Sequence, residues 1–328
     1  MKRTMALVVL IVVAGCTSVI GAIFQRDSSV HFKVVDYNGY AVSNATVKIN
    51  TMKKWIPGEN FGRTIYMDVY GKSDTNGEAH ITFPCKSTMF SYSVGADGFY
   101  GCGGGAQFAA VPDGLDLRQT QFETNFIVRL KPIVKPIQMY VINMPFGLGK
   151  SIEYPGKAHS GSWGFDLKAG DWVRPFGVGE VADFTVEYSD LHYESDKALD
   201  CALVFTNGVH DGCYISEFTG TRFRSDYAAN TNAVYMKRLD FESWGQKYVG
   251  RYAARLLCDN QYIVIRTRTK CDDYGRLVSA YYAKIYGPIW LLDGMNFVSY
   301  FNPNKNDPNL EADTTVNLMP HGRKGFAP

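Results

Sequence analysis

Apolar and polar residues alternate over short stretches along most of the chain, which is the pattern of half-buried β-strands. The first stretch covers residues 30–35, and the stretches 46–49, 79–83 and 90–94 follow it. No apolar repeat of helical period continues for more than a turn or two, so no long amphipathic helix is predicted. Turn sequences separate the stretches, and Asn76-Gly77 supplies the positive φ of a tight turn. The pattern therefore predicts an all-β protein.

The strand pattern resumes at Ile137 and continues through the second half of the chain. The clearest runs are 138–142, 181–188, 202–205, 214–218, 252–257, 262–269 and 277–286. The last two runs flank a turn region at 270–275, which predicts a hairpin. The tail from Asn302 to Pro328 is rich in Asn, Asp and Pro, and either packs as a strap or extends freely.

A short proline-flanked segment separates the two halves. Proline at positions 132 and 136 blocks helix formation and disfavours strand pairing, so residues 132–136 are predicted to form a stiff linker. The strand-rich regions on either side are 30–131 and 137–328. Because two-sheet packing is the default for short alternating strands, the sequence predicts two tandem β-sandwich domains after a signal peptide.

The N-terminus has the organisation of an export signal. Lys2 and Arg3 precede an apolar run from Met5 to Val13, and two small residues stand before Cys16. The sequence Val-Ala-Gly-Cys at 13–16 resembles the lipobox of bacterial lipoproteins. This resemblance implies a signal peptide at 1–15, diacylglycerol and palmitate-type acylation at Cys16, and a lipidated tether at 16–29. The expected location is the cell envelope, on the outer membrane or cell surface, with the membrane as partner.

An uncleaved signal anchor is the alternative for this segment. The apolar character continues beyond Cys16, and Met5 to Phe24 is about long enough to span a bilayer. Gly15, Thr17, Ser18 and Gly21 weaken the second half of such a helix. Both interpretations place the rest of the chain outside the cytoplasm.

Three stretches of the first half resemble the carboxypeptidase regulatory-like, or transthyretin-like, modules of bacterial surface proteins: VVDYNGYAVSNATVKI, SDTNGEAHITF and YSVGADGFYG. This resemblance implies a seven-stranded β-sandwich without an active site of its own. Residues 55–62 and 101–121 are then insertions that lengthen its loops. In the second half, GFDLKAGDWVRPFG, RTRTKCDDYGRLVSAYYAKIYG and FNPNKNDPNLEADTTVNL resemble an uncharacterised C-terminal domain of bacterial secreted proteins. That family carries no known activity, so this resemblance adds nothing about function.

Composition excludes wholesale disorder, because 46% of residues are hydrophobic and 20% are charged. The formal net charge is +2, and removal of Lys2 and Arg3 with a signal peptide would leave a neutral chain. A neutral chain lacks the electrostatic footprint of nucleic-acid binding, so no nucleic-acid partner is expected.

Six cysteines remain besides Cys16, in a compartment where disulfides can form. A Cys258–Cys271 disulfide is disfavoured because the predicted strand between them holds them more than about 20 Å apart. Cys201 and Cys213 flank the turn Asn207-Gly208 on adjacent predicted strands. They form a candidate disulfide if the loop is bulged or longer than two residues. Buried free thiols are the alternative for all six.

Complete catalytic or metal-binding motifs are missing from the sequence. The six histidines are scattered singly, so neither a metal site nor a cofactor is predicted. The glycine run at 101–105 lacks the following helix of a phosphate loop and is interpreted as a flexible surface loop. The stretch 159–164 lacks the context of a nucleophile elbow and is interpreted as a polar loop. The acidic residues between Glu187 and Asp200 do not have EF-hand spacing, so a solvated loop is favoured over a calcium site.

Aromatic and acidic residues gather between Trp163 and Asp183. Trp163, Trp172, Phe176 and Asp171 form a candidate ligand-binding surface, because nearby glycines let the backbone turn and leave aromatic faces on loops. The sequence therefore predicts a lipoprotein without catalytic activity that binds a glycan or an envelope protein, or has a structural role. The alternative is a polysaccharide-acting enzyme in which Asp171 or Asp183, close to Asp166 in sequence, serves as acid or base.

Overall fold

The structure is a computed structural model that describes residues 27–58, 62–84, 87, 89–108, 123–144, 151–155, 160–189, 200–218, 225–248, 251–291 and 294–320. Within these ranges the chain forms strands and no helix, as the hydrophobic pattern predicts. No helix there is long and apolar enough to span a membrane. Cys16, the signal peptide at 1–15 and most of the predicted tether lie outside the described residues. The chain divides into two compact units, one ending at Ile133 and one beginning at Val134.

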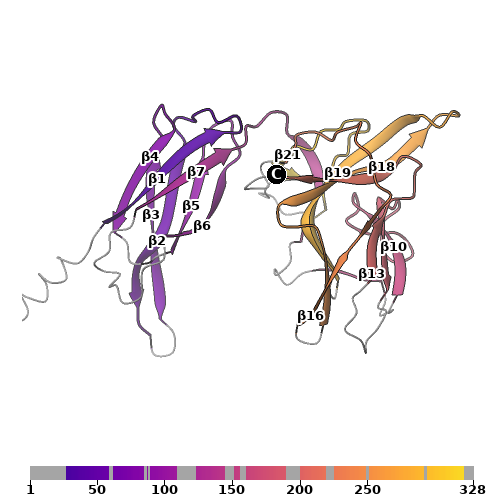
Figure 1. Cartoon of the computed structure of the whole chain (residues 1–328), viewed down its shortest axis with the longest axis horizontal. Coiled ribbons are helices and arrows are strands. Elements are labelled where there is room, and N and C mark those ends of the chain that lie inside the picture. The colour runs from indigo at the N-terminus through magenta and orange to yellow at the C-terminus, as the bar shows by residue number, and fades with distance from the viewer. Residues whose placement is uncertain are drawn as a thin grey trace, which may run out of the picture. The chain divides into compact units, whose positions relative to one another are not determined.

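Unit 1 contains two sheets that share one core (Figure 1). The three-stranded sheet has the order β4 (Glu78–Pro84), β1 (Asp27–Asp36), β7 (Glu123–Leu130), with β1 antiparallel to β4 and parallel to β7. The four-stranded antiparallel sheet has the order β3 (Arg63–Lys72), β2 (Thr46–Ile56), β5 (Met89–Gly95), β6 (Cys102–Gln107). Alternate apolar residues of both sheets meet between them, so the unit is sandwich-like.

Three sequence interpretations in unit 1 need correction. The glycine run at 101–105 is not a loop, because β6 includes Gly103 to Gly105 and pairs with β5 along its whole length. Because glycine has no side chain to pack, a run of glycines shows no alternation of apolar and polar residues and gives no strand signal in the sequence. Pairing with β5 forms the strand instead. Residues 55 and 56 belong to β2 rather than to a loop insertion. β1 begins at Asp27, so the end of the predicted tether is already strand.

Unit 2 also has two sheets. The five-stranded sheet has the order β11 (Asp171–Trp172), β10 (Ser160–Asp166), β12 (Phe184–Ser189), β13 (Asp200–Val204), β15 (Arg238–Asp240). The nine-stranded sheet has the main order β14 (Gly212–Glu217), β18 (Gln261–Cys271), β19 (Leu277–Leu291), β20 (Gly294–Phe301), β8 (Ile137–Met144), β21 (Ala312–Asn317), with β9 (Ile152–Glu153), β16 (Glu242–Tyr248) and β17 (Arg251–Leu256) attached beside it.

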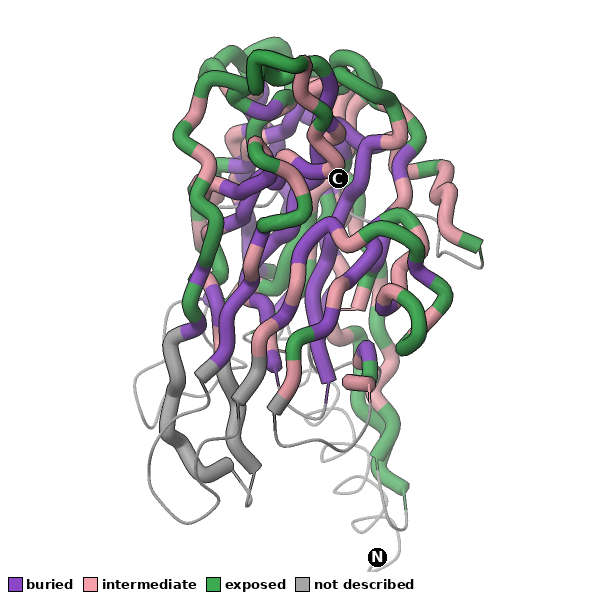
Figure 2. Tube along the Cα trace, turned by 90° about the vertical axis from the view of Figure 1, so that its right-hand side faces the viewer, coloured by how far each residue is buried: buried purple, intermediate pink, exposed green. Residues whose placement is uncertain are grey.

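The central strands β18, β19 and β20 of the nine-stranded sheet are buried on both faces over much of their length. One face packs on the five-stranded sheet through a cluster that includes Phe165, Phe184 and Phe297. A second cluster covers the other face, and Leu310 and Ala312 of the C-terminal segment belong to it. β20 is buried at every position. Figure 2 shows long buried stretches along the strands and exposed stretches mainly in the connections at the top of the view. The tail up to residue 320 therefore packs as a strap.

The predicted linker at 132–136 is hydrogen-bonded on both sides of the unit boundary. The Ile133 N–H donates to the Gly98 carbonyl of unit 1 at 2.8 Å. The Val134 N–H donates to a Glu311 carboxylate oxygen of unit 2 at 2.9 Å. Each half of the segment is thus tied to its own unit.

Three turns have the same construction, at residues 36–40, 74–78 and 272–276. In each turn the first residue is Asp, and its Oδ1 accepts the N–H groups two and four residues later at 2.8–3.0 Å. The glycine at the fourth position has a φ of 77° to 87°. The Asp side chain replaces backbone partners inside the turn, and glycine accepts the left-handed φ without strain. A five-residue sequence pattern therefore sets each turn.

Candidate functional site

Arg268 forms ion pairs with two of the three aspartates in the acidic region predicted from sequence, Asp166 and Asp183. Its Nε lies 2.8 Å from Asp183 Oδ1, and its Nη2 lies 2.7 Å from Asp166 Oδ1 and 2.8 Å from Asp183 Oδ2. Asp166 ends β10, Asp183 precedes β12, and Arg268 comes from β18 of the other sheet. This Arg268 clamp, made of Arg268, Asp166 and Asp183, connects the two sheets of unit 2.

A bulge in β18 directs the Arg268 side chain toward Asp166 and Asp183. The register of β18 against β19 shifts after Thr267, and Arg268 has a φ of 53°. Bulges of this kind redirect a side chain locally. The guanidinium also lies 4.8 Å from the centre of the Phe301 ring, which places it among apolar groups. The sequence contains no signal for this bulge, so Arg268 was not predicted as a partner of the aspartates.

Every carboxylate oxygen of the clamp accepts hydrogen bonds. Asp183 accepts bonds from the Leu167 N–H and the Thr267 hydroxyl besides those from Arg268. Asp166 accepts bonds from backbone N–H groups of residues 168, 169, 180 and 181. The side chains of Asp183 and Asp166 are 0% and 5% exposed. Neither carboxylate is therefore accessible at the protein surface to a substrate.

The pKa values of the two carboxyls shift in opposite directions. Burial disfavours ionised Asp166, yet the backbone N–H groups of Glu180, Ala169 and Val181 and the charge of Arg268 outweigh it and lower the pKa. Burial raises the pKa of Asp183, and the hydrogen bonds and charge of Arg268 oppose that rise. The clamp thus resembles a structural ion-pair network more than an exposed acid–base pair.

Trp163 and Trp172 were predicted to display ring faces on loops, and the structure corrects this prediction. Trp163 lies in β10 and Trp172 in β11, and they are only 5% and 3% exposed. Their rings pack edge to face, 6.2 Å apart, and the Trp172 Nε1 donates to the Glu153 carbonyl at 2.6 Å. Residues 160–164 of the stretch 159–164 are accordingly not a polar loop, since β10 begins at Ser160 and buries Trp163 and Phe165, whereas residue 159 lies outside the described residues.

The glycines of this region explain why the prediction failed. A Cβ at Gly164 would lie 2.7 Å from the Ala182 Cβ, and one at Gly177 would lie 2.4 Å from the Trp172 carbonyl oxygen. These glycines allow close packing rather than frequent turning. Asp171 binds the Trp172 and Val178 N–H groups, and Phe176 is 54% exposed. Of the predicted surface, only the Phe176 ring is thus displayed to solvent as expected.

The candidate disulfide between Cys201 and Cys213 is absent. Cys201 lies on β13 of the five-stranded sheet, whereas Cys213 lies on β14 of the nine-stranded sheet and is a buried free thiol. The chain changes sheets after Asn207-Gly208, so the two strands do not form a hairpin. Burial raises the pKa of the Cys213 thiol to about 12. Cys258 and Cys271 are also free and lie at opposite ends of β18, as predicted.

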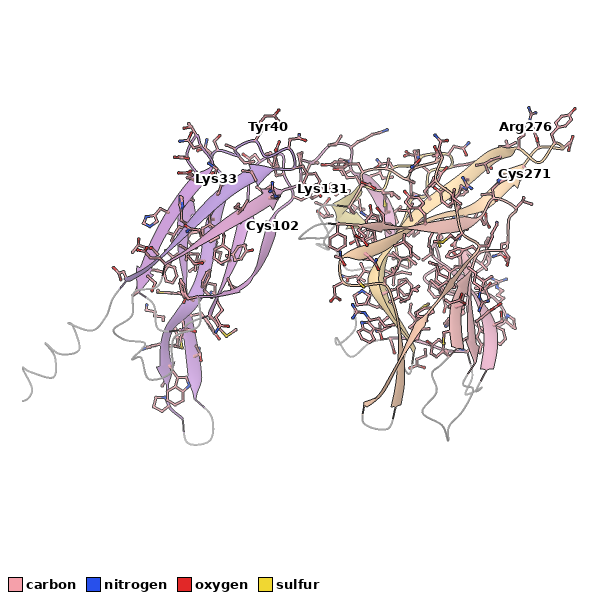
Figure 3. The ribbon with its side chains drawn as sticks, viewed as in Figure 1. Lys33, Tyr40, Cys102, Lys131, Cys271 and Arg276 are labelled. Atoms are coloured by element: carbon pink, nitrogen blue, oxygen red, sulfur yellow. The ribbon has the colours of Figure 1, made fainter. Side chains whose placement is uncertain are left out.

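Figure 3 shows Cys271 near the end of the β18–β19 hairpin and Cys102 in unit 1. Burial raises the pKa of the Cys102 thiol to about 11. In the part of the chain that the structure describes, no three His, Cys, Asp or Glu side chains gather as metal ligands. The acidic stretch 190–199 lies outside that part.

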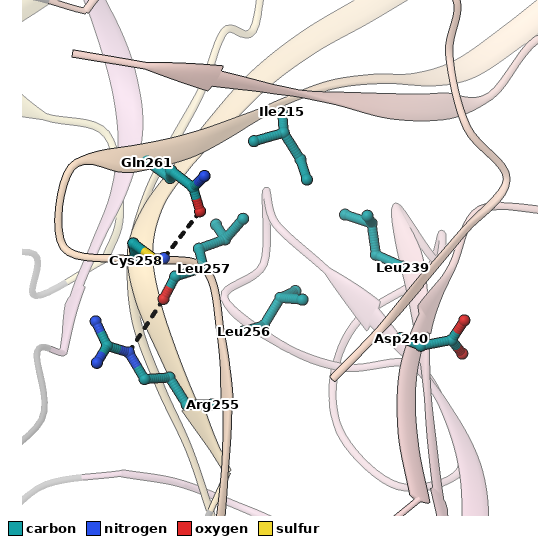
Figure 4. Close-up of a pocket in the computed structure, with 8 residues that line it drawn as sticks. All are labelled: Ile215, Leu239, Asp240, Arg255, Leu256, Leu257, Cys258 and Gln261. Carbon is teal, nitrogen blue, oxygen red and sulfur yellow. Dashed lines mark hydrogen bonds between the residues drawn. The ribbon is translucent and has the colours of Figure 1, made fainter. Parts of the chain in front are cut away.

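A cavity of about 350 Å³ opens between β14, β15 and β17 (Figure 4). Its apolar lining comes from Ile215, Leu239, Leu256 and Leu257. Two of its polar groups bond within the β17–β18 connection: Arg255 Nε donates to the Leu257 carbonyl at 3.1 Å, and a Gln261 side-chain oxygen accepts the Cys258 N–H at 2.9 Å. The Gln261 side-chain nitrogen donates to a Glu217 carboxylate oxygen of β14 at 2.9 Å. The cavity could hold a small apolar group but presents no acid–base pair.

Unit 1 carries exposed aromatic side chains that the sequence interpretation missed. Trp55, Tyr66 and Tyr70 on the β2–β3 hairpin are 57%, 61% and 61% exposed. The alternation of Tyr66, Asp68 and Tyr70 along β3 was the available signal, because residues two apart share one face. We call the surface formed by Trp55, Tyr66, Tyr70, Lys48 and Asp68 the aromatic hairpin face.

Comparison with known proteins gives distant structural likenesses only. No protein-family model and no curated protein matches the chain. Chlorocatechol 1,2-dioxygenase from Pseudomonas putida aligns with 9% identity and a TM-score of 0.23, over 33% of this chain and 61% of that enzyme. This chain therefore spans less than two thirds of the enzyme's length.

Two pilins also align. A streptococcal ancillary pilin aligns with 13% identity and a TM-score of 0.20, over 51% of this chain and 54% of the pilin. The full-length major pilin SpaD from Corynebacterium diphtheriae aligns with 9% identity and a TM-score of 0.25, over 88% of this chain and 84% of the pilin. At these TM-scores the likenesses carry no conclusion about function.

Proposed function

We propose that this chain is an exported, lipid-anchored protein without catalytic activity, in which two tandem β-sandwiches present a ligand-binding surface outside the cytoplasm. The observation that carries the proposal is the Arg268 clamp. Of the acidic residues that offered the best case for catalysis, Asp166 and Asp183 are buried and saturated by structural hydrogen bonds, whereas Asp171 is half-buried. The lipobox-like sequence at 13–16 supports the anchor.

The ligand in this proposal is a glycan or an envelope protein. Loops and exposed faces on a rigid β scaffold are common places for binding. The exposed aromatic rings on unit 1 support a binding role, since such rings stack on apolar ligand faces. No cofactor, metal or nucleic acid forms part of the proposal.

The anchor is tested by growth with radiolabelled palmitate and comparison of the wild type with Cys16→Ser. We expect label in the wild type and none in the variant. Cys102→Ser serves as the matched control, because it removes a thiol from the described fold and leaves the lipobox-like sequence intact. Equal labelling of wild type and Cys16→Ser, or no label in either, would contradict the lipid anchor.

The absence of catalysis is tested on a panel of polysaccharides with the purified protein. We expect no release of reducing ends. Asp171 has the least buried carboxyl among the acidic candidates, so Asp171→Asn is the informative variant. Hydrolysis by the wild type that disappears in Asp171→Asn would replace this proposal with the polysaccharide-acting enzyme.

A further inference from the structure

The β2–β3 hairpin of unit 1 extends past the rest of its sheet (Figure 1). β5 pairs with β2 only from Thr46 to Thr51, whereas β3 continues to pair with β2 up to Ile56. Tyr70 lies opposite Lys48, Tyr66 opposite Met52, and Trp55 opposite Thr64. Because Thr64, Tyr66 and Tyr70 share one face of β3, the three aromatic rings form a row about 20 Å long.

Polar groups separate the rings of the aromatic hairpin face. Asp68 Oδ1 accepts a hydrogen bond from Asn50 Nδ2 at 2.8 Å, and Asp68 Oδ2 lies 2.9 Å from Lys48 Nζ. The same Lys48 Nζ lies 5.9 Å from the centre of the Tyr70 ring. Rings separated by hydrogen-bonding groups suit a ligand that alternates apolar ring faces with hydroxyl or carboxylate groups.

The strands beside this row of rings carry mostly small side chains on the same face. Opposite the ring-bearing hairpin, β5 presents Ser91 and Ser93, and β6 places Gly105 and Gly103 beside them. A Cβ added at Gly105 would meet nothing within 4 Å. A polymer lying across the face therefore meets little steric obstruction from these strands.

The hairpin is also strongly basic. Its two strands contain one acidic residue, Asp68, and five basic residues, Lys48, Lys53, Lys54, Arg63 and Lys72. The whole sequence has a formal net charge of only +2. By the register, Lys48 and Lys72 share the ring-bearing face, whereas Lys54 and Arg63 lie on the reverse face. The ring-bearing face therefore has more basic than acidic side chains, and an acidic ligand complements it.

We propose that the aromatic hairpin face binds an acidic polysaccharide, whose sugar rings stack on Trp55, Tyr66 and Tyr70 and whose carboxylates approach Lys48 and Lys72. The inference rests on the ligand-binding role proposed above and moves the site from the second unit to the first. A membrane surface would be expected to contact the end of a hairpin. Tyr66, Asp68 and Tyr70 instead follow its flank, so the polysaccharide is the favoured occupant.

The test measures binding of the detergent-solubilised full chain by titration calorimetry. The probes are polygalacturonate and neutral dextran of similar length, and in a separate measurement the wild type and the tyrosine variants are reconstituted without detergent on vesicles that contain anionic phospholipid. We expect binding to polygalacturonate that weakens with added salt and much weaker binding to dextran. Vesicle association should be equal in the wild type and the tyrosine variants, because the lipid anchor and not the aromatic hairpin face would carry it. Tyr66→Ala and Tyr70→Ala should each weaken polygalacturonate binding by roughly three- to tenfold, the size expected for one stacked ring.

Tyr274→Ala is the matched control, because Tyr274 is 84% exposed on the β18–β19 hairpin of the other unit. It should leave affinity unchanged, and thermal melting should show that all three variants fold. Equal binding of dextran, weaker vesicle association of the tyrosine variants than of the wild type, or equal affinity of wild type and tyrosine variants for polygalacturonate would overturn the proposal. Palmitate labelling does not depend on Tyr66 or Tyr70, so this site can fail while the lipid anchor stands.

Discussion

Arg268 and Arg238 each bind two carboxylates, but in opposite surroundings. The Arg268 side chain is 16% exposed and contacts nearly inaccessible aspartates. The Arg238 side chain is 45% exposed, and its partners Glu187 and Asp240 are 43% and 66% exposed. Charges removed from water depend on their partners, whereas exposed pairs are screened by solvent. The two arginines therefore offer a direct comparison of a buried and an exposed network.

Replacement of Arg268 by Met should destabilise the protein by about 3–5 kcal/mol, because two buried carboxylates lose their cation. Arg238→Met should cost less than about 1 kcal/mol. Urea denaturation followed by tryptophan fluorescence measures both values. Similar losses for the two variants would show that the Arg268 clamp contributes no more than a surface pair.

The lowered pKa of Asp166 predicts a specific dependence of protein stability on pH. This pKa is lowered in the folded protein, so ionised Asp166 stabilises the fold above its unfolded pKa of about 3.9, and this stabilisation disappears as the pH falls through the lower folded value. The stability difference between wild type and Asp166→Asn should be constant from about pH 5 to 7 and shrink below about pH 4. Urea denaturation across this range measures it. A stability difference that grows as the pH falls would mean that the pKa of Asp166 is raised rather than lowered in the folded protein.

At the scale of elements, the recurring Asp-initiated turns show how local sequence fixes a connection. Gly77 belongs to one of these turns and Gly98 to a turn of another kind at residues 96–99, and both have positive φ, at 78° and 80°. Their surroundings differ, since a Cβ at Gly77 would lie 2.3 Å from the Val34 carbonyl oxygen, whereas one at Gly98 would meet nothing within 4 Å. Gly77 therefore serves both the turn and the approach of the turn to β1.

Gly98→Ala should destabilise the protein by about 1 kcal/mol through backbone strain alone. Gly77→Ala adds a steric clash with backbone and should cost at least about 2 kcal/mol. Thermal melting of both variants gives the comparison. If the two variants had the same melting temperature, the close approach of Gly77 to Val34 would not contribute to the requirement for glycine at position 77.

At the scale of the whole molecule, each unit has its own hydrophobic core. One cluster lies within unit 1, and two clusters cover the faces of the nine-stranded sheet in unit 2. The residues on either side of the boundary bond to their own unit. Separate cores are the physical condition for separate folding.

Fragments 27–133 and 134–320 should therefore each unfold cooperatively when expressed alone. Circular dichroism should show β structure in both, with a single melting transition for each fragment. A fragment that lacks a cooperative transition would mean that its core is insufficient without the remainder of the chain.

The sequence by itself determined the all-β class, many strand positions and the Asp-initiated turns, because alternation and turn chemistry depend on residues close in sequence. The hairpin of β18 and β19 appears where 262–269 and 277–286 predicted it. The strand β20 was missed, since all its residues are buried and it shows no alternation.

Only the tertiary structure decided which sheet each strand joins and which side chains reach the surface. Trp163 and Trp172 look like a binding surface in sequence but pack between two sheets, whereas Trp55, Tyr66 and Tyr70 remain exposed on an overhanging hairpin. Cys201 and Cys213 are near in sequence yet lie on different sheets. The Arg268 clamp joins residues about a hundred positions apart through one bulge. Such contacts depend on long-range strand pairing, and local sequence does not encode that pairing.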